Sequence, residues 1–296
     1  MGSHNPYRDW VYDYAKLLRQ GRSIVERPTG VAAGKARADA PKALIFAPHP
    51  DDETIIGGLP LRLARELGFR VIDVAVTLGS RLERREGRRQ ELIDACTYLG
   101  FELYIPGGDG FSDINPEARK QLPENWGSAV AILTSLLAAE QPTAIFLPHA
   151  EDWNRTHLGV HQLVMEALAR QPAAFACQVV ETEFWGAMDT PNLLVESSQE
   201  DVADLVAALS LHVGEVARNP YHLRLPAWLT DNVRRGGELV GGQGAAVPDF
   251  AFATLYRLRR WSHGRVQPVL SGGRALACGD ALGELFNTST PHNSEV

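Results

Sequence analysis

The chain is poor in cysteine, has no long apolar run and carries no excess of positive charge. Its cysteines, Cys96, Cys177 and Cys278, are odd in number, far apart and in no Cys-x-x-Cys pattern, so a disulfide framework is not expected. No stretch approaches the roughly 20 apolar residues that cross a bilayer, and no basic segment followed by an apolar core marks the N-terminus. We therefore expect a cytoplasmic protein with no membrane partner.

The charge balance is acidic, with 36 Asp and Glu against 29 Lys and Arg, for a formal net charge of -7. Without a global basic field, nucleic acid is not an expected partner. The 296 residues are 45% hydrophobic, which allows a sizeable core in one large domain or two modest ones. A homo-oligomer is compatible with this composition.

From residue 42 onward, short apolar runs alternate with segments of helical periodicity. The expected strands cover 43–47, 70–77, 102–105, 144–147 and 178–184, and the expected helices cover 55–67, 83–99, 126–140 and 157–170. This alternation predicts βαβ units, and therefore an α/β fold with a Rossmann-like parallel sheet and helices on both faces.

The organisation along the chain follows from these patterns. Residues 1–41 are expected to form an N-terminal helical extension and linker, with a helix over 6–20 docked on the main domain. Residues 42–190 are expected to form the α/β core. Residues 191–296 are expected to be a C-terminal elaboration of the same domain that shapes a substrate pocket.

Within that elaboration, residues 201–218 have the pattern of an amphipathic helix and 252–261 of a late strand. The Gly- and Pro-rich residues 219–250 predict a long ordered loop, either a lid or a pocket wall, in which Trp228 could stack on a ligand. Gly236 and Gly237 are expected to be turn glycines, because no phosphate-loop pattern surrounds them.

Residues 47–53 read Ala-Pro-His-Pro-Asp-Asp-Glu and directly follow an apolar strand. Open α/β sheets build their sites at the carboxyl ends of such strands. Imidazole nitrogen and carboxylate oxygen suit zinc, and a carboxylate left beside the metal could take a proton from water. The motif predicts a hydrolytic metalloenzyme; the alternative is a loop whose aspartates only cap the next helix.

A second segment, 148–161, follows the expected strand at 144–147 and contains His149, His157 and His161. Two neighbouring strand ends in a parallel sheet can face one crevice, so this segment is the best source of a further ligand. His157 and His161 lie one helical turn apart, and either or both could bind the metal.

These segments resemble the LmbE-like, or PIG-L, family of zinc-dependent N-deacetylases, which includes deacetylases of N-acetylglucosaminyl conjugates. Residues 47–53 are similar to the family's Ala-His-Pro-Asp-Asp-Glu signature, with Pro48 inserted. Residues 77–80 sit where the family has Thr-x-Gly, 88–100 resemble its Arg-x-x-Glu helix ending in Leu-Gly, and 154–157 sit where it has His-Pro-Asp-His. The resemblance covers roughly residues 42–185.

The resemblance implies that His49, Asp52 and His157 bind one Zn²⁺ per chain, with other divalent metals as alternatives, and that Asp51 is the general base. The implied reaction removes an N-acetyl or other N-acyl group from an amino sugar or its conjugate. The partner is then a small N-acylated molecule. Bound zinc would lower the pKa of its water toward about 7 and polarise the amide carbonyl.

The resemblance also implies roles for residues around the metal. Asn154 stands where the family has a histidine that helps the oxyanion and leaving group; an amide can donate a hydrogen bond but cannot shuttle a proton. Either Asp51 returns the proton or another group such as His149 assists. Arg88 is expected to contact substrate, and Asp109 to orient a histidine or a sugar hydroxyl.

Several of these residues also have a simpler structural interpretation. The other arginines of 81–89 are expected on a solvated helix face, and His212 and His222 as ordinary hydrogen-bonded histidines. A zinc amidase for a larger acyl group or another C–N bond would use the same site. A metal-containing binding protein without catalysis is a further alternative, and a nucleotide-binding protein is a weaker one.

Overall fold

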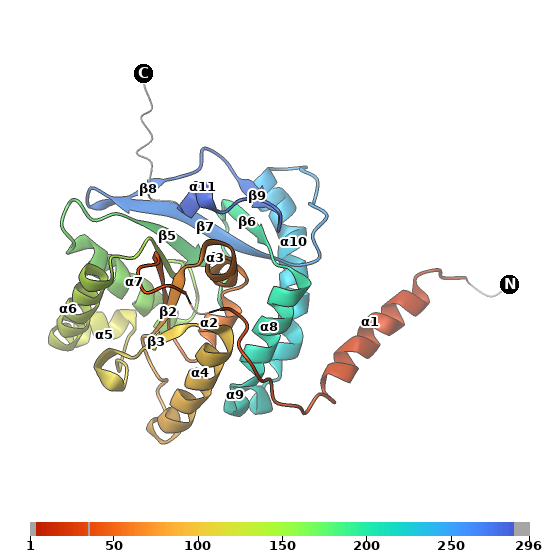
Figure 1. The fold of residues 1–296 in the computed structure, drawn as a ribbon, viewed down its shortest axis with the longest axis horizontal. Coiled ribbons are helices and arrows are strands. Elements are labelled where there is room, and N and C mark those ends of the chain that lie inside the picture. The colour runs from red at the N-terminus through yellow and green to blue at the C-terminus, as the bar shows by residue number, and fades with distance from the viewer. Residues whose placement is uncertain (1–3, 35, 287–296) are drawn as a thin grey trace.

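The computed structural model describes residues 4–34 and 36–286. At its centre is a nine-stranded sheet of order β3-β2-β1-β4-β5-β7-β6-β9, with β8 paired to β7. The strands are β1 Lys42–Ala47, β2 Arg70–Ala75, β3 Glu102–Tyr104, β4 Ala144–Pro148, β5 Cys177–Thr182, β6 Leu193–Glu196, β7 Ala253–Ser262, β8 Arg265–Pro268 and β9 Arg274–Leu276. Helices lie on both sides of this sheet (Figure 1).

The first five strands are all parallel, as predicted. The α/β fold class with a Rossmann-like sheet is therefore confirmed. The sheet is mostly rather than wholly parallel, because β7 runs antiparallel to both β5 and β6. A turn at His263 and Gly264, both with positive φ, then folds β8 back on β7.

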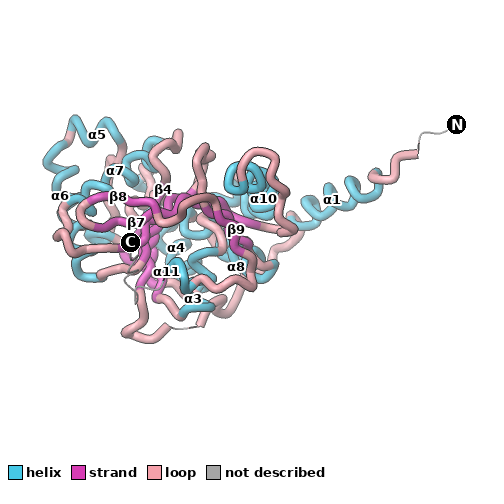
Figure 2. Tube along the Cα trace, turned by 90° about the horizontal axis from the view of Figure 1, so that it is seen from above, coloured by secondary structure: helices cyan, strands magenta, loops and turns pink. Residues whose placement is uncertain are grey.

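The helices flank the strands in two layers, which Figure 2 shows from above. The described helices are α1 Arg8–Gly21, α2 Asp52–Ile55, α3 Leu59–Leu67, η1 Leu82–Arg84, α4 Arg85–Leu99, η2 Pro106–Gly108, α5 Pro116–Gln121, α6 Pro123–Glu140, α7 Arg155–Ala169, α8 Gln199–Ser210, α9 Val213–Arg218, η3 Tyr221–Arg224, α10 Leu225–Gly241 and α11 Gly283–Phe286. The η elements are short 3₁₀ helices.

Alternation along β1 separates the two hydrophobic layers. Ile45 packs with side chains of α3, α4 and α8, whereas Leu44 and Phe46 pack with those of α6 and α7. All three side chains are fully buried, and each such burial contributes roughly 1.5–3 kcal/mol. Packing on both faces holds β1 firmly, and the loop that follows it starts from a fixed point.

The helix expected over 55–67 is divided into α2 and α3. The division lies at Gly57, whose φ is +90°. A Cβ there would come within 2.1 Å of Thr254 Oγ1, so only glycine fits the turn. The expected helix over 201–218 is likewise divided into α8 and α9; Ser198 and Asp201 form a capping box at the start of α8.

The expectation of a long loop over residues 219–250 is wrong, because most of this segment is helical. It contains η3 and the 17-residue α10. Gly236 lies inside α10, where a Cβ would meet Leu194 Cδ1 of β6 at 2.7 Å, so the glycines serve close helix-sheet packing rather than turns. Trp228 also lies in α10 and packs against the hydrophobic core instead of standing in a loop.

The N-terminal helix α1 has the expected place in the sequence and contacts the main part of the protein at η3. None of its residues is buried, and Trp10 is 69% exposed. Figure 1 shows α1 projecting from the rest of the protein. Within residues 4–34 and 36–286, no helix is both long and apolar enough to pass through a bilayer.

Candidate metal centre and active site

The predicted motifs meet at a reversal of strand order. From β1 the chain moves to β2 and β3, and it then returns to β4 on the other side of β1. In open α/β sheets, ligands bind at the carboxyl ends of strands that flank such a reversal. His49 and Asp52 follow β1, and His157 lies at the start of α7, shortly after β4.

His49, Asp52 and His157 each offer a ligand atom, and these three atoms lie within 4.8 Å of one another. His157 Nε2 is 3.3 Å from His49 Nδ1 and 3.4 Å from Asp52 Oδ2. His49 Nδ1 is 3.3 Å from the same carboxylate oxygen. Three ligands with one partly exposed member match the ligand number of catalytic zinc sites, which keep a further position for water.

The surroundings of these residues fit a divalent cation. Asp52 Oδ1 is buried and has no hydrogen-bond partner in the described part of the chain. His157 Nδ1 lies 3.1 Å from Asp152 Oδ2, so the other ring nitrogen is directed at the group. Asp152 is itself held by the backbone N–H of Asn154, at 2.8 Å. His161 lies outside the group, with Nδ1 2.9 Å from the Pro148 carbonyl.

Charge interactions within the group are strong because it is buried. Burial by itself raises the pKa of Asp52, but His157 and His49 outweigh that effect and lower it. Burial by itself lowers the pKa of His157, yet Asp52 and Asp152 raise it to about 9. The carboxylate is therefore negative and ready for a cation, whereas His157 must lose a proton to become a ligand.

Asp51 is held in a different way from its neighbour. It lies at the N-cap position of α2, but its side chain makes no capping hydrogen bond, so capping does not account for it. Its φ of 112° is rare for a residue with a side chain. The backbone N–H of Asp51 donates to Glu53 Oε2 at 2.8 Å, and the Tyr221 hydroxyl donates to Asp51 Oδ2. The carboxyl group thereby lines the pocket beside His49.

Burial, and then the carboxylate of Asp52, raise the pKa of Asp51 to about 8. His212, Tyr221 and Arg88 act in the opposite direction. Positive charge at the neighbouring ligand group would lower this pKa by the same Coulombic effect.

Glu53 and His212 form a buried pair beneath this loop. His212 Nε2 lies 2.7 Å from Glu53 Oε1, and both side chains are fully buried. The pair connects the metal loop to the junction of α8 and α9. The expectation of an ordinary hydrogen-bonded histidine holds for His212, but its partner lies 159 residues away in the sequence and no local pattern marks it.

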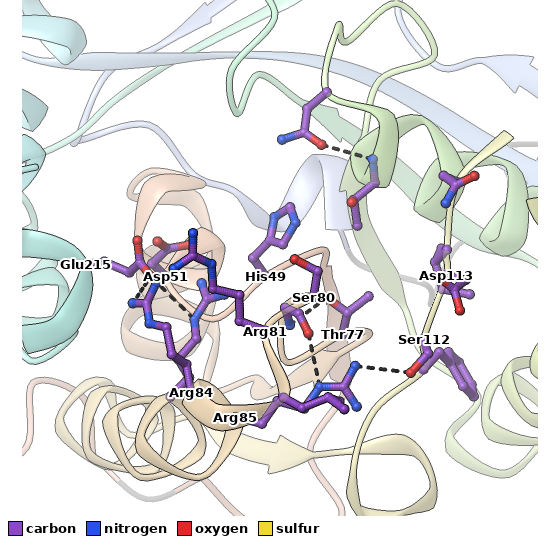
Figure 3. A pocket seen from close by; sticks show the side chains of 18 of the residues that line it. His49, Asp51, Thr77, Ser80, Arg81, Arg84, Arg85, Ser112, Asp113 and Glu215 are labelled. Atoms are coloured by element: carbon purple, nitrogen blue, oxygen red, sulfur yellow. Dashed lines mark hydrogen bonds and ion pairs between the residues drawn. The ribbon is translucent and has the colours of Figure 1, made fainter. Parts of the chain in front are cut away.

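The pocket beside the ligand group has a volume of about 680 Å³. The loops after β1, β2 and η2 line it, together with residues of η1, α4, α7, α9 and η3. Figure 3 shows part of the lining around His49 and Asp51. The lining includes Gly79, Arg81, Arg84, Arg85, Arg88, Ser112, Asp113, Asn154, Glu215, Arg218 and Tyr221.

Besides His49 and Asp51, two further predicted functional residues, Arg88 and Asn154, lie in this lining. Arg88 Nη2 donates to the Pro50 carbonyl at 3.1 Å, and its Nε is 3.7 Å from Glu215. Asn154 is the N-cap of α7: its Oδ1 accepts the N–H of Thr156 at 2.9 Å, which leaves the Nδ2 group to donate.

Two others lie elsewhere. His149 is fully buried, with Nε2 2.7 Å from the Gly186 carbonyl and Nδ1 3.3 Å from the Glu151 N–H, so both ring nitrogens are engaged by main chain. The side chain of Asp109 is 81% exposed and pairs with Arg89 outside the pocket. Neither His149 nor Asp109 is among the residues that line the pocket.

Among the arginines of 81–89 other than Arg88, the expectation of solvent exposure holds for Arg81, whereas Arg84 and Arg85 are half-buried. Arg81, Arg84 and Arg85 all line the pocket, because the chain from Gly79 through η1 turns along its edge. Sequence reasoning also missed Tyr221 and Glu215, which come from the C-terminal part of the chain and carry no motif.

Comparison with known proteins agrees with this geometry. Residues 44–168 match the PIG-L family, described as GlcNAc-PI de-N-acetylase. No curated protein has a sequence that matches the chain. The predicted resemblance to the PIG-L, or LmbE-like, family is therefore confirmed over residues 44–168.

Solved structures share the fold at low sequence identity. The N,N'-diacetylchitobiose deacetylase from Pyrococcus horikoshii has a TM-score of 0.55 and 19% identity, over 91% of this chain and 98% of its own. The zinc-inhibited form of teicoplanin deacetylase has a TM-score of 0.53 and 15% identity, over 74% and 98%. The 4-carboxy-2-hydroxymuconate hydratase GalB from Pseudomonas putida has a TM-score of 0.53 and 16% identity, over 74% and 95%.

Because a hydratase shares the fold, the fold alone does not decide the reaction. The family model that matches residues 44–168 is described as a de-N-acetylase, an enzyme that hydrolyses amide bonds. Metal dependence agrees with the His49, Asp52 and His157 group.

Proposed function

We propose that the protein is a zinc-dependent hydrolase that removes an N-acetyl or related N-acyl group from an amino sugar or its conjugate. The observation that carries the proposal is the carboxyl group of Asp51, which is not one of the three converging ligands but lines the pocket directly beside them. The family description and the names of two solved deacetylases of this fold support the N-acetyl sugar class.

In the proposed site, His49, Asp52 and His157 hold the metal. When bound, zinc activates water and polarises the amide carbonyl. Asp51 takes the proton from the attacking water, as a general base within the same loop. The negative charge that then develops on the carbonyl oxygen can accept a hydrogen bond from Nδ2 of Asn154.

Collapse of the tetrahedral intermediate breaks the C–N bond and requires a proton on nitrogen. With both nitrogens of His149 engaged by main chain, we assign the return of this proton to Asp51. The Tyr221 hydroxyl, which donates to Asp51, orients the carboxylate for both transfers. The products are a free amine and acetate, so water is the only co-substrate.

Release of acetate tests this function directly. The protein is stripped with a chelator, reloaded with zinc and assayed on N-acetylglucosamine conjugates. The reloaded wild type should release acetate, and Asp51→Asn should lower kcat by about 10²- to 10⁴-fold, the range for loss of a general base. Zinc content measured on both proteins should be equal, since Asp51 is not a ligand.

Asp249→Asn is the matched control, because Asp249 is an exposed carboxylate outside the pocket. Activity of this variant should equal that of the wild type. If zinc binds but no acyl substrate in a broad panel is cleaved, and Asp51→Asn changes nothing, the hydrolase proposal is wrong. Turnover confined to longer acyl groups would instead identify an amidase at the same site.

The remaining assignments are part of this proposal. Residues 42–190 supply the metal ligands, and the C-terminal residues 191–296 act as the pocket-shaping part of the same domain, since Glu215, Arg218 and Tyr221 line the cavity. The cytoplasmic location and a homo-oligomeric state stay predictions.

A further inference from the structure

One side of the pocket holds five arginines. Arg81, Arg84, Arg85 and Arg88 come from the segment that enters α4, and Arg218 comes from the end of α9. We call these five residues the arginine wall; Figure 3 shows three of them labelled beside His49 and Asp51. In a chain with a formal net charge of -7, such a concentration of positive charge does not follow from composition.

A single buried carboxylate serves three of these arginines. Glu215 Oε1 lies 2.5 Å from Arg84 Nη2 and 3.7 Å from Arg88 Nε, and Glu215 Oε2 pairs with Arg218. Burial by itself raises the pKa of Glu215, but Arg88, Arg84 and Arg218 outweigh it and keep the group ionised. Three positive charges therefore share one negative charge.

The other two arginines have no acidic partner among the described residues. Arg85 donates from Nε to the Gly79 carbonyl and from Nη2 to Ser112 Oγ, both at 3.1 Å. These neutral acceptors hold the guanidinium in place without cancelling its charge. No hydrogen bond or ion pair of the Arg81 side chain to another described residue is found. Besides Glu215, the described lining residues include two carboxyl groups, Asp51 beside the ligand group and the exposed Asp113.

Arg89, on the same helix, provides the internal contrast. It lies outside the pocket and pairs with both Asp109 and Glu86. Acidic partners therefore neutralise Arg89, which lies outside the pocket. Arg81 and Arg85, which line the pocket, have no such counter-charge among the described residues. Gathering like charges costs electrostatic energy, and an anion bound among them recovers that energy. The positive end of the 15-residue helix α4 starts at Arg85 and acts in the same direction.

Resting on the proposed deacetylase function, we propose that the substrate carries an anionic group, a phosphate or a carboxylate, and that Arg81 and Arg85 bind it while the N-acyl group lies at the metal centre. Guanidinium groups match the planar, two-oxygen edges of both anions. Ser112, already bonded to Arg85, offers a hydroxyl to the same group. The natural substrate class is thus an acidic N-acyl amino-sugar conjugate rather than a neutral sugar.

The test compares three substrates on the zinc-loaded full chain: methyl N-acetylglucosaminide, which is neutral, N-acetylglucosamine 1-phosphate, and N-acetylmuramic acid, which bears a carboxylate. We expect a higher kcat/KM for one or both acidic substrates, and the phosphate and carboxylate arms show which anion is preferred. The double variant Arg81→Gln/Arg85→Gln should lose about 10- to 100-fold on the acidic substrate, as expected for lost hydrogen bonds to a charged group. Its kcat/KM on the neutral substrate should fall much less, because that substrate has no anion for the two arginines to bind.

Arg89→Gln is the matched control, because it removes a charge from the same helix outside the pocket; its kcat/KM should equal that of the wild type on all three substrates. Increasing ionic strength should weaken the preference for the acidic substrate. Equal kcat/KM on neutral and acidic substrates would overturn the inference and leave the deacetylase function intact. An equal loss on both kinds of substrate in the double variant would overturn it as well.

Failure of the proposed function gives a different result. If no substrate is cleaved, calorimetry on the zinc-loaded Asp51→Asn protein measures binding of N-acetylglucosamine 1-phosphate directly. Binding that is lost in the Asp51→Asn/Arg81→Gln/Arg85→Gln protein supports the anion site, although the reaction assigned to it is then wrong. No binding, or binding independent of both arginines, contradicts the anion site itself.

Discussion

The two sides of the pocket are built on opposite principles. The ligand side, His49, Asp52 and His157, follows two central strands and is nearly closed to solvent. The arginine wall comes from surface segments that join at the pocket edge, and its members are half-buried or exposed. On the ligand side, Asp52 and the two histidines stabilise one another's charges. In the arginine wall, Glu215 balances only part of the positive charge.

This difference has a consequence for mutation. A buried, mutually dependent group loses its function when one member is removed, because the others are held for a shared ion. A partly exposed set of like charges loses binding strength in steps, because water and salt screen each member. Substitutions on the two sides should therefore differ in size and in their dependence on salt and pH.

The largest effect is expected on the ligand side. His157→Ala removes a fully buried ligand, so zinc content should fall to background and kcat/KM by about 1,000-fold or more, equivalent to several kcal/mol of transition-state stabilisation. Metal analysis and acetate release measure the two effects. His161→Ala, one helical turn further along, should keep its zinc; loss of metal from that variant and not from His157→Ala would reverse the ligand assignment.

A smaller effect is expected at Asp152, which contacts the ligand His157. Asp152→Asn keeps the shape of the side chain that holds His157 Nδ1 but weakens the charge interaction. Partners of metal-bound histidines typically contribute 10- to 100-fold in metal affinity. Competition with a chelator should show a loss in that range, while zinc at saturating concentration should restore most of the activity. An unchanged affinity would mean that Asp152 does not tune the ligand.

On the arginine wall, Glu215→Gln should act on stability. Removing the shared carboxylate leaves Arg84, Arg88 and Arg218 without their counter-charge, at a cost of about 1–3 kcal/mol at neutral pH. The folded pKa of Glu215 is lowered, so its contribution is complete above the ordinary carboxyl range and is lost as pH falls through the folded value. Denaturant unfolding at several pH values should show the gap between wild type and variant closing in acid; a gap that widens in acid would contradict the pairing.

The smallest effect is expected far from both sides of the pocket. Trp10→Ser on α1 replaces a side chain that is 69% exposed in a helix with no buried residue. Unfolding free energy should change by no more than about 0.5 kcal/mol, and kcat/KM should be unchanged. A larger loss of stability would show that α1 is packed against another surface in solution.

The sequence predicted most of the α/β core because its signals are local. The apolar runs at β1 and β4 and the helical periods between them are visible in windows of ten or fifteen residues. The prediction failed for α10, since Gly236 and Gly237 look like turn residues in isolation. Only the close approach to Leu194 of β6 explains glycine in the middle of that helix.

The candidate site divides in the same way. His49, Asp51 and Asp52 sit in one short motif, so their residue types predicted a metal site, and the resemblance to the PIG-L family implied which of them is the base. Their dependence on Tyr221 and His212 could not be predicted, because these partners lie some 160 to 170 residues away and have no pattern of their own. The arginines of 81–89 other than Arg88 were expected to face solvent, because a charged helical stretch has that pattern whether or not a pocket lies beside it.

By itself, then, the sequence predicted the fold class and the two short motifs that supply the candidate ligands, since each motif consists of residues close together in the chain. The tertiary structure alone decided which charges surround the substrate, because Glu215 and Arg218 reach Arg84 and Arg88 only when α9 folds against α4. Chemistry at a strand end is encoded locally, whereas the electrostatics of a pocket depend on every segment that folding brings to its edge.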